Sequence, residues 1–221
     1  MTAPSAKAAG IAGILAGAGL LIELAFFLSS GWQPHVFADP AVALAFLEER
    51  GGYMRAAGLA GSVNLCFATI FVAGLAARLQ RAPTAATATL YLGVVGIAVH
   101  ALVPIGLWLG APTFSAMAAH GAGVVQPAWA AFVAFMAVAG GVGYLFLGLS
   151  MVAAGFGGAS TKALPPALAW LTMAGGAATV TIILAEATPF GMLVPLAFLP
   201  SIALSILFRI WAGVVLMRSG A

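Results

Sequence analysis

The sequence predicts an all-α membrane protein: a bundle of six transmembrane helices, with a short amphipathic helix on the outer surface between the first and second spans. The first observation behind this prediction is composition. Of the 221 residues, 63% are hydrophobic and only 6% are charged, whereas a soluble domain has about 25% charged residues. Such a chain cannot cover a surface that faces water, so the lipid bilayer is its expected solvent.

The second observation is that the apolar residues gather in six long runs. Each run offers about 20 or more mostly apolar residues, enough to cross a hydrocarbon layer of ~30 Å. None shows the ~10-residue alternation of a membrane β-barrel strand. We therefore expect one helical domain over residues 1–221, with spans at 8–30, 56–77, 86–110, 127–154, 166–188 and 192–217.

The first run is expected to be a mature span and not a signal peptide. It is longer than the 7–15 residues typical of a signal sequence. It also contains Glu23, and no small-x-small cleavage motif precedes Gly31.

The connection 31–55 contains signals for a helix of its own. Asp39-Pro40 is a typical helix start, an N-cap followed by proline in the first turn. Gly51-Gly52 is a typical stop signal. We expect the residues between them to form a short helix on the outer surface of the bundle. The other outer connection, 111–126, is rich in small residues and is expected to be a loop.

The distribution of charge predicts the orientation. With six spans, no acidic residue shares the side that carries Lys7, Arg78, Arg81, Lys162 and Arg218. The positive-inside rule then places both termini in the cytoplasm, with the protein in the cell (inner) membrane. The formal net charge is +3, but the basic residues separate the spans and form no patch, so nucleic acid is not an expected partner.

Three spans each carry one strongly polar side chain: Glu23, Asn64 and His100. At ~1.5 Å per residue, all three lie within about 3–6 Å of the membrane midplane, on its outer side. Ionisable groups inside the membrane cost about 2.5–3.5 kcal/mol on insertion scales and are functional candidates for that reason.

Helical spacing predicts that these three side chains face the bundle interior. Gly19 precedes Glu23 by four residues, Gly61 precedes Asn64 by three, and Gly96 precedes His100 by four. Residues at these spacings share a helix face, and small residues mark helix contacts in bilayers. Pro104 has no N–H to offer the carbonyl of His100, so a bend is expected there. Glu23 and Asn64 are the expected partners of the imidazole.

The remaining polar and aromatic residues are expected to have ordinary roles. Arg209 is predicted to lie near the inner interface and to extend its side chain into water. Cys66 is predicted to be a small buried residue. The tryptophans toward the span ends are predicted to form an interfacial belt: Trp108, Trp129, Trp170 and Trp211.

Several chemistries lack the residues they need. Haem ligation by two histidines would require a second histidine within a span, and a retinal Schiff base would require a lysine in a late span. A zinc site would need His35 or His120 to fold deep beside His100 and Glu23. No serine lies in a nucleophile motif. We therefore expect no cofactor, no metal and no catalytic residue, although an enzyme acting at the outer face remains a third hypothesis.

Two functional hypotheses come first. In one, Glu23, Asn64 and His100 form a binding site for a small polar ligand, an ion or a proton, as in a transporter. His120 and Glu186, near the outer face, could contribute to such a site. In the other, the trio is a hydrogen-bonded clamp between helices of an accessory or structural protein, which would bind a membrane-protein partner or a second copy of itself. The sequence identifies neither the ligand nor the oligomeric state.

Two stretches carry recognisable motifs. The first begins FADPAVALAFLEERGGYMR and contains a DPA-x-A-L segment before the second span. The second joins LPPALAWLTMAGG to FRIWAGVVLMRSG and opens the fifth span with an LP-x-x-L-x-W segment. In these motifs the chain resembles a group of small six-span bacterial integral membrane proteins of unknown function. The resemblance implies a bacterial inner-membrane protein and assigns no catalytic residue.

Overall fold

Helices make up almost all of the structure, a computed structural model that describes residues 4–31, 39–118, 122–186 and 194–219. No strand occurs in these four stretches. The elements in chain order are α1 (Ala6–Ser29), α2 (Pro40–Arg78), α3 (Pro83–His100), α4 (Leu102–Ala118), α5 (Ala122–Thr161), α6 (Pro166–Glu186) and α7 (Val194–Ser219). Within the described residues, six helical stretches are long and apolar enough to cross a membrane, with α3 and the first half of α4 forming one of them. The predicted all-α membrane bundle is confirmed.

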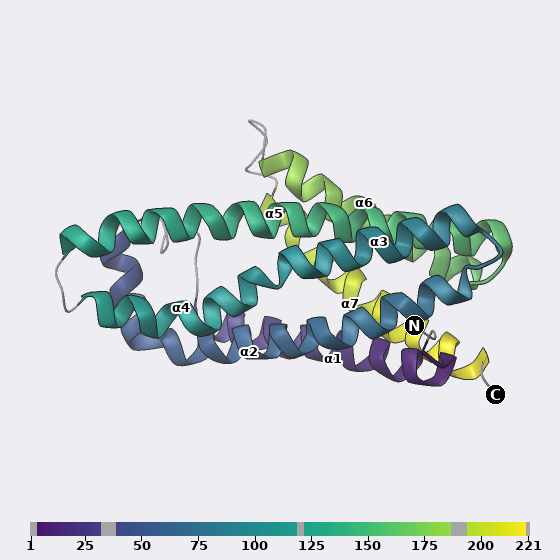
Figure 1. Cartoon of the computed structure of the whole chain (residues 1–221), viewed down its shortest axis with the longest axis horizontal. Coiled ribbons are helices and arrows are strands. Elements are labelled where there is room, and N and C mark those ends of the chain that lie inside the picture. Colours follow the sequence, from purple (N-terminus) through teal and green to yellow (C-terminus); the bar gives the residue numbers. More distant parts are fainter. Residues whose placement is uncertain (1–3, 32–38, 119–121, 187–193, 220–221) are drawn as a thin grey trace.

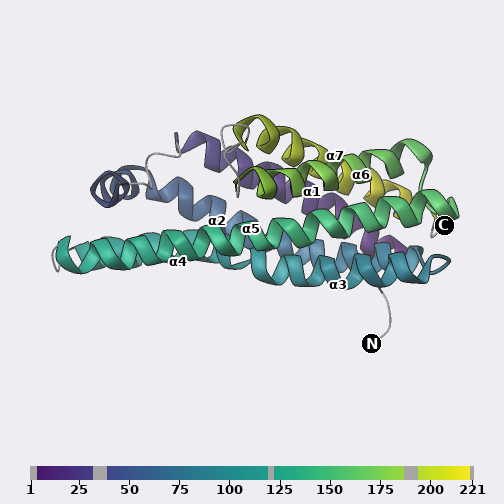
Figure 2. The ribbon, with the colours of Figure 1, turned by 90° about the horizontal axis from the view of Figure 1, so that it is seen from above.

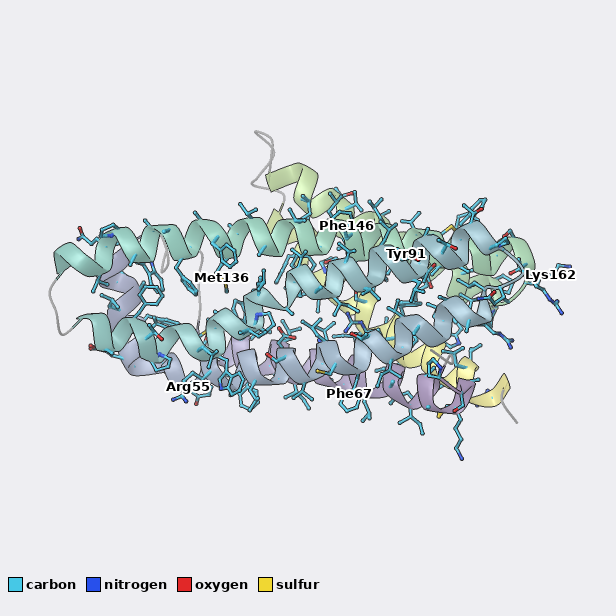
Figure 3. All side chains as sticks on the ribbon, in the orientation of Figure 1. Arg55, Phe67, Tyr91, Met136, Phe146 and Lys162 are labelled. Atoms are coloured by element: carbon cyan, nitrogen blue, oxygen red, sulfur yellow. The ribbon has the colours of Figure 1, made fainter. Side chains whose placement is uncertain are left out.

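The helices run side by side along one long axis (Figure 1). Helix α1 packs against α2 and α7, and α5 packs against α3 and α6. The first turn of α1 and the last turn of α7 lie at the same end of the bundle, which also carries Lys162 (Figures 1 and 3). Arg55 lies toward the opposite end (Figure 3). The basic residues of the loops and termini therefore share one end, as the charge distribution predicted.

Two hydrophobic clusters occupy the two halves of the bundle. The larger one, near the termini, includes Ala12, Phe71 and Leu75. The smaller one, toward the other end, contains five buried residues: Ala43, Leu47, Met54, Phe114 and Trp129. Along α2, Asn64 falls between the residues that join the smaller cluster and those that join the larger one. The polar residues of the bundle interior therefore lie where one apolar core ends and the other begins.

The predicted helix between the first two spans is present, but it is not separate from the second span. Asp39 caps it as expected, because its Oδ1 accepts hydrogen bonds from the N–H groups of Ala41 (2.8 Å) and Val42 (3.4 Å). Gly51-Gly52 does not end the helix, and α2 continues to Arg78. The first turns of α2 cross the end of the bundle, and Figure 2 shows them nearly end-on while the rest of the helix lies in view.

The continuity of α2 has a physical reason. A helix end leaves up to four carbonyl groups without partners, and such groups are costly close to lipid. Two glycines inside a helix cost only about 1 kcal/mol each. Nothing lies within 4 Å of the positions where Cβ atoms would stand at Gly51 and Gly52, so the chain has room to bend there without breaking its hydrogen-bond ladder.

The predicted loop at 111–126 is also largely helical. Helix α4 continues to Ala118, and α5 begins at Ala122. The stretch is rich in alanine, which has the highest helix propensity. At ~1.5 Å per residue, the 40 residues of α5 span ~60 Å, about twice the hydrocarbon thickness. Helix α5 is therefore longer than one crossing of the hydrocarbon layer requires, and α4 runs alongside its first half at the end of the bundle away from the termini (Figure 1).

The predicted bend in the third span coincides with a break between two helices. The helix is interrupted at Ala101, between α3 and α4. Pro104 follows three residues later, and its missing N–H cannot bond the carbonyl of His100. The ladder continues around the interruption, because Ala101 N–H bonds Ile97 O at 2.9 Å and Ile105 N–H bonds Ala101 O at 3.2 Å.

Two predictions about single residues are wrong. Cys66 is exposed on the outer surface of the bundle, because it follows Asn64 by two residues and so lies roughly 200° around the helix from that buried amide. Trp129 is only 2% exposed, and its ring packs edge-on against Phe114 at a centroid distance of 4.9 Å. It belongs to the smaller core and not to an interfacial belt. Trp170 is 69% exposed, as a belt residue should be.

Candidate functional site

Helices α1 and α2 meet through a reciprocal pairing of glycine with a polar side chain. A Cβ atom at Gly19 would lie 3.0 Å from Cβ of Asn64, and one at Gly61 would lie 2.6 Å from Oε1 of Glu23. Each polar side chain therefore rests on the glycine of the facing helix. The spacing of small residues predicted that both polar side chains face the bundle interior, and glycine is what lets two helix backbones approach in a bilayer.

Asn64 joins two charged side chains from different helices. Its Nδ2 donates a hydrogen bond to Oε2 of Glu23 at 3.3 Å, and its Oδ1 accepts one from Nη1 of Arg209 at 2.7 Å. Asn64 is 2% exposed, and both charged residues are partly buried. The polar chain Glu23–Asn64–Arg209 thus connects α1, α2 and α7 inside the bundle.

The prediction that Arg209 extends into water at the inner interface is wrong. The apolar stretch of α7 that could cross a membrane runs from Phe198 to Arg218, and Arg209 lies close to its middle. An arginine at that depth is costly unless it is paired. The short bond to Asn64 and the opposite formal charge of Glu23 in the same chain provide that pairing.

His100 lies across the bundle from this chain. It is 9% exposed, and its ring lies 4.5 Å from the ring of Tyr144, centroid to centroid, at an interplanar angle of 48°. A Cβ atom at Gly143 would stand 2.7 Å from Cβ of His100, so this glycine allows α5 to approach the histidine closely. In the described part of the chain, Nδ1 of His100 is buried and has no hydrogen-bond partner. The structure therefore pairs Glu23 with Asn64 but leaves the imidazole unpaired with either.

Three adjoining cavities surround these polar groups. The inner cavity, about 70 Å³, is lined by Asn64, Arg209, His100 and Tyr144 among others. The middle cavity, about 210 Å³, shares His100 and Tyr144 with the inner one and adds Glu23. The lateral cavity, about 280 Å³, shares Phe27, Val103 and Leu107 with the middle one. Shared wall residues place the three cavities next to one another, in a series that begins at the polar chain.

The inner cavity has further polar walls. Ser150 donates its hydroxyl hydrogen to Thr89 O at 2.8 Å, and Ser201 donates to Phe198 O at 2.9 Å. Their oxygen atoms can still accept a hydrogen bond. A volume of about 70 Å³ exceeds the roughly 15 Å³ that one water molecule needs. The inner cavity can therefore hold a few water molecules or a small ion against donors and acceptors on four sides.

The two predicted contributors from the outer face cannot be placed at the site. His120 falls in residues 119–121, outside the described stretches. Glu186 ends α6, and its side chain also lies outside what the structure describes. In the described residues, no three histidine, cysteine, aspartate or glutamate side chains come close enough together to hold a metal ion.

The sequence contained signals for the two site residues that were missed. Arg218 marks the interface end of α7, and Arg209 precedes it by nine residues, or ~13 Å along the helix axis. That distance is nearly half of a hydrocarbon layer of ~30 Å, so Arg209 could have been placed near the midplane. Tyr144 lies near the centre of the predicted span 127–154, where its hydroxyl group also needs a partner.

The chain was compared with protein families, with curated proteins and with solved structures, and no match was found in any of the three.

Proposed function

We propose that this multi-pass membrane protein binds a small ligand, an ion or a proton at the intramembrane site formed by Glu23, Asn64, His100 and Arg209. The observation that carries the proposal is the open space beside the polar chain. A purely structural cluster in a bilayer is expected to be packed tightly, because each void forfeits van der Waals contacts. Here the cavities adjoin Glu23, Asn64, Arg209 and His100.

The unpaired imidazole supports the same proposal. Buried polar groups in native proteins nearly always have a hydrogen-bond partner, either protein or an ordered water molecule. Nδ1 of His100 has none among the described residues, and the His100 ring lines both the inner and the middle cavity. The imidazole ring, with its Nδ1 covered by protein, therefore borders the space that a bound ligand or water molecule would fill.

The alternative function is a helix clamp in an accessory or structural protein. It is favoured by the hydrogen bonds from Asn64 to Glu23 and Arg209, which tie three helices together. A clamp of this kind would account for the three residues of the polar chain Glu23–Asn64–Arg209. It gives no role to His100 or to the cavities, and for that reason we place it second.

The proposed location follows from the charge distribution and the shared end of the two termini. We place the protein in the inner membrane of a bacterium, with both termini in the cytoplasm, because the end that carries the termini and Lys162 is the basic one. The bacterial origin rests on the resemblance to small six-span proteins described above and stays a prediction.

The experiment that tests the proposed function is thermal stability in detergent across pH and across a panel of ions and small polar ligands. Wild type is compared with Glu23→Gln, which keeps the shape of the side chain and removes its charge. Glu48→Gln is the matched control, because Glu48 is exposed on the outer turns of α2. We expect at least one condition to shift the melting midpoint of wild type and of the control, but not of Glu23→Gln.

The two functions give different results in this experiment. Suppose that Glu23→Gln is as stable as wild type or more stable, and that a condition which shifts the melting midpoint of wild type no longer shifts that of the variant. The polar site is then maintained at a cost in stability, as functional sites often are. If Glu23→Gln is simply less stable and no condition shifts wild type, the clamp is correct and the proposed binding function is wrong.

A further inference from the structure

We propose that the ligand of this site is a neutral, lipid-soluble carbonyl compound of the quinone class, which enters sideways from the bilayer between α4 and α5. This inference rests on the proposed binding function and specifies the chemistry of the ligand. It follows from three features of the cavity series: its apolar wall, its lateral position and the balance of charge at its inner end.

The walls of the middle and lateral cavities are almost entirely apolar. Glu23, His100 and Tyr144 line one end of the middle cavity, and its other walls are aliphatic or aromatic. The lateral cavity is walled by aromatic and aliphatic side chains: Phe27, Val103, Leu107, Trp129, Phe132, Val133, Met136 and Ala137. A small hydrophilic solute gains nothing from such a wall, whereas an alkyl or prenyl tail gains about 25 cal/mol per Å² of apolar area that it buries.

The lateral cavity lies between two helices whose outward faces are apolar. Val103 and Leu107 come from α4, and Met136 and Phe132 come from α5. Figure 3 shows Met136 on the side of α5 that faces α4, and a Cβ atom at Gly106 of α4 would lie 2.6 Å from its sulfur. Every residue that lines the lateral cavity belongs to a helical stretch long and apolar enough to cross a membrane. A cavity at that depth borders hydrocarbon and not water, so the ligand reaches it from the bilayer.

The inner end of the series favours a head group without net charge. Glu23 and Arg209 carry opposite formal charges and are joined through Asn64, so the polar chain is already balanced. A charged head group would therefore leave water without gaining an unpaired counter-charge at this site. A neutral carbonyl oxygen can instead accept a hydrogen bond from the imidazole of His100, whose ring lines both the inner and the middle cavity.

The dimensions suit a flat ring followed by a tail. A cavity of about 150 Å³ lined by apolar side chains is known to hold a benzene ring, and the middle cavity is about 210 Å³. The ring would lie beside the His100 and Tyr144 rings, which contact each other at a tilt of 48°, and the tail would follow the lateral cavity past Phe132 and Met136. A benzoquinone with an alkyl tail has this combination of a planar, doubly hydrogen-bond-accepting head and an apolar body.

Two adjacent glycines provide a matched test. Gly140 lines the middle cavity, and a Cβ atom there would meet only Val103 Cγ2, at 3.5 Å. Gly140→Leu should therefore fill the cavity without a backbone clash. Gly141 points elsewhere, and a Cβ atom there would meet only Ile183 Cδ1, at 3.9 Å. Gly141→Leu adds the same side chain one residue away and leaves the cavity open.

The experiment titrates 2-decyl-1,4-benzoquinone into the purified full chain in detergent and follows the melting midpoint. We expect a saturable rise for wild type and Gly141→Leu, and at least a tenfold weaker apparent affinity for Gly140→Leu. Decane, decanoate and decyltrimethylammonium should each require at least tenfold higher concentrations to act. The inference is overturned if the quinone produces no rise in wild type, if Gly140→Leu responds as wild type does, or if any of the three comparison compounds acts as strongly as the quinone.

A second measurement needs no variant. An arylazido derivative of the same quinone, photolysed on wild type, should label peptides that contain Leu107 or Met136. Labelling confined to other parts of the chain contradicts lateral entry. If the quinone fails in both measurements while Glu23→Gln still abolishes the effect of an ion or a proton, the quinone inference is wrong and the proposed binding function stands.

Discussion

Replacing Asn64 with leucine should separate the two charged residues that this amide connects. Leucine has the same branched shape at Cγ, so Asn64→Leu keeps the packing against Gly19 and removes two interhelical hydrogen bonds. Such bonds in membrane proteins are worth about 0.6 kcal/mol on average and about 1.7 kcal/mol at most. Two of them give an expected loss of about 1–3 kcal/mol in the free energy of unfolding, with the upper end favoured because Arg209 would lose its short bond inside the bundle.

The assay is reversible unfolding in mixed detergent micelles, and Ser62→Ala is its control. Ser62 lies two residues from Asn64, but its hydroxyl bonds only Gly58 O of the same helix, at 2.8 Å. We expect Ser62→Ala to stay within about 0.5 kcal/mol of wild type, as is usual for a change that removes no tertiary contact. A double-mutant cycle of Asn64→Leu with Arg209→Met should then show a coupling energy of at least 0.5 kcal/mol, as residues in one hydrogen-bond network do. If Asn64→Leu were as stable as its control, or if the cycle showed no coupling, the polar chain would not contribute to stability.

Three further predictions concern packing, capping and orientation. Gly143→Ala should lose about 1–3 kcal/mol of stability in the same assay, because its methyl group would meet backbone atoms of α3, whereas Gly141→Ala should stay within about 0.5 kcal/mol. Asp39→Ala removes the N-cap of α2 and should lower the stability of this helix end by about 1 kcal/mol. The loss should appear as faster amide hydrogen exchange in the first turns of α2, and unchanged exchange would show that the cap is dispensable. Orientation can be tested with single cysteines in a background without the native Cys66. A charged thiol reagent should label Lys162→Cys only from the cytoplasmic side and Arg55→Cys only from the opposite side. Labelling of both variants from one side would contradict the proposed topology.

The polar residues of the spans illustrate how far sequence reasoning reached into the candidate site. Glu23, Asn64 and His100 could be found because an ionisable or amide group is rare in an apolar run, and their small-residue stripes showed which way they face. The structure pairs Glu23 with Asn64, whereas the sequence predicted both as partners of His100. Helical spacing shows which way a side chain faces but not which helices become neighbours. Arg209 was missed because its depth depends on where α7 ends, and helix ends are the least certain feature of an apolar run.

The amino-acid sequence was enough to predict a helical membrane bundle. It also predicted that the basic residues of the loops and termini share one end, and that polar groups from several spans lie near one depth. These properties follow from composition and from the periodicity of single helices, which are local. The tertiary structure was needed to show that Gly51-Gly52 lies within a bent α2, that Arg209 completes the polar chain, and that His100 packs against Tyr144 beside a cavity. Those features depend on which helices become neighbours and on how tightly they pack. Cavities in particular are what remains after all the side chains have been placed, so no single segment of the sequence encodes them.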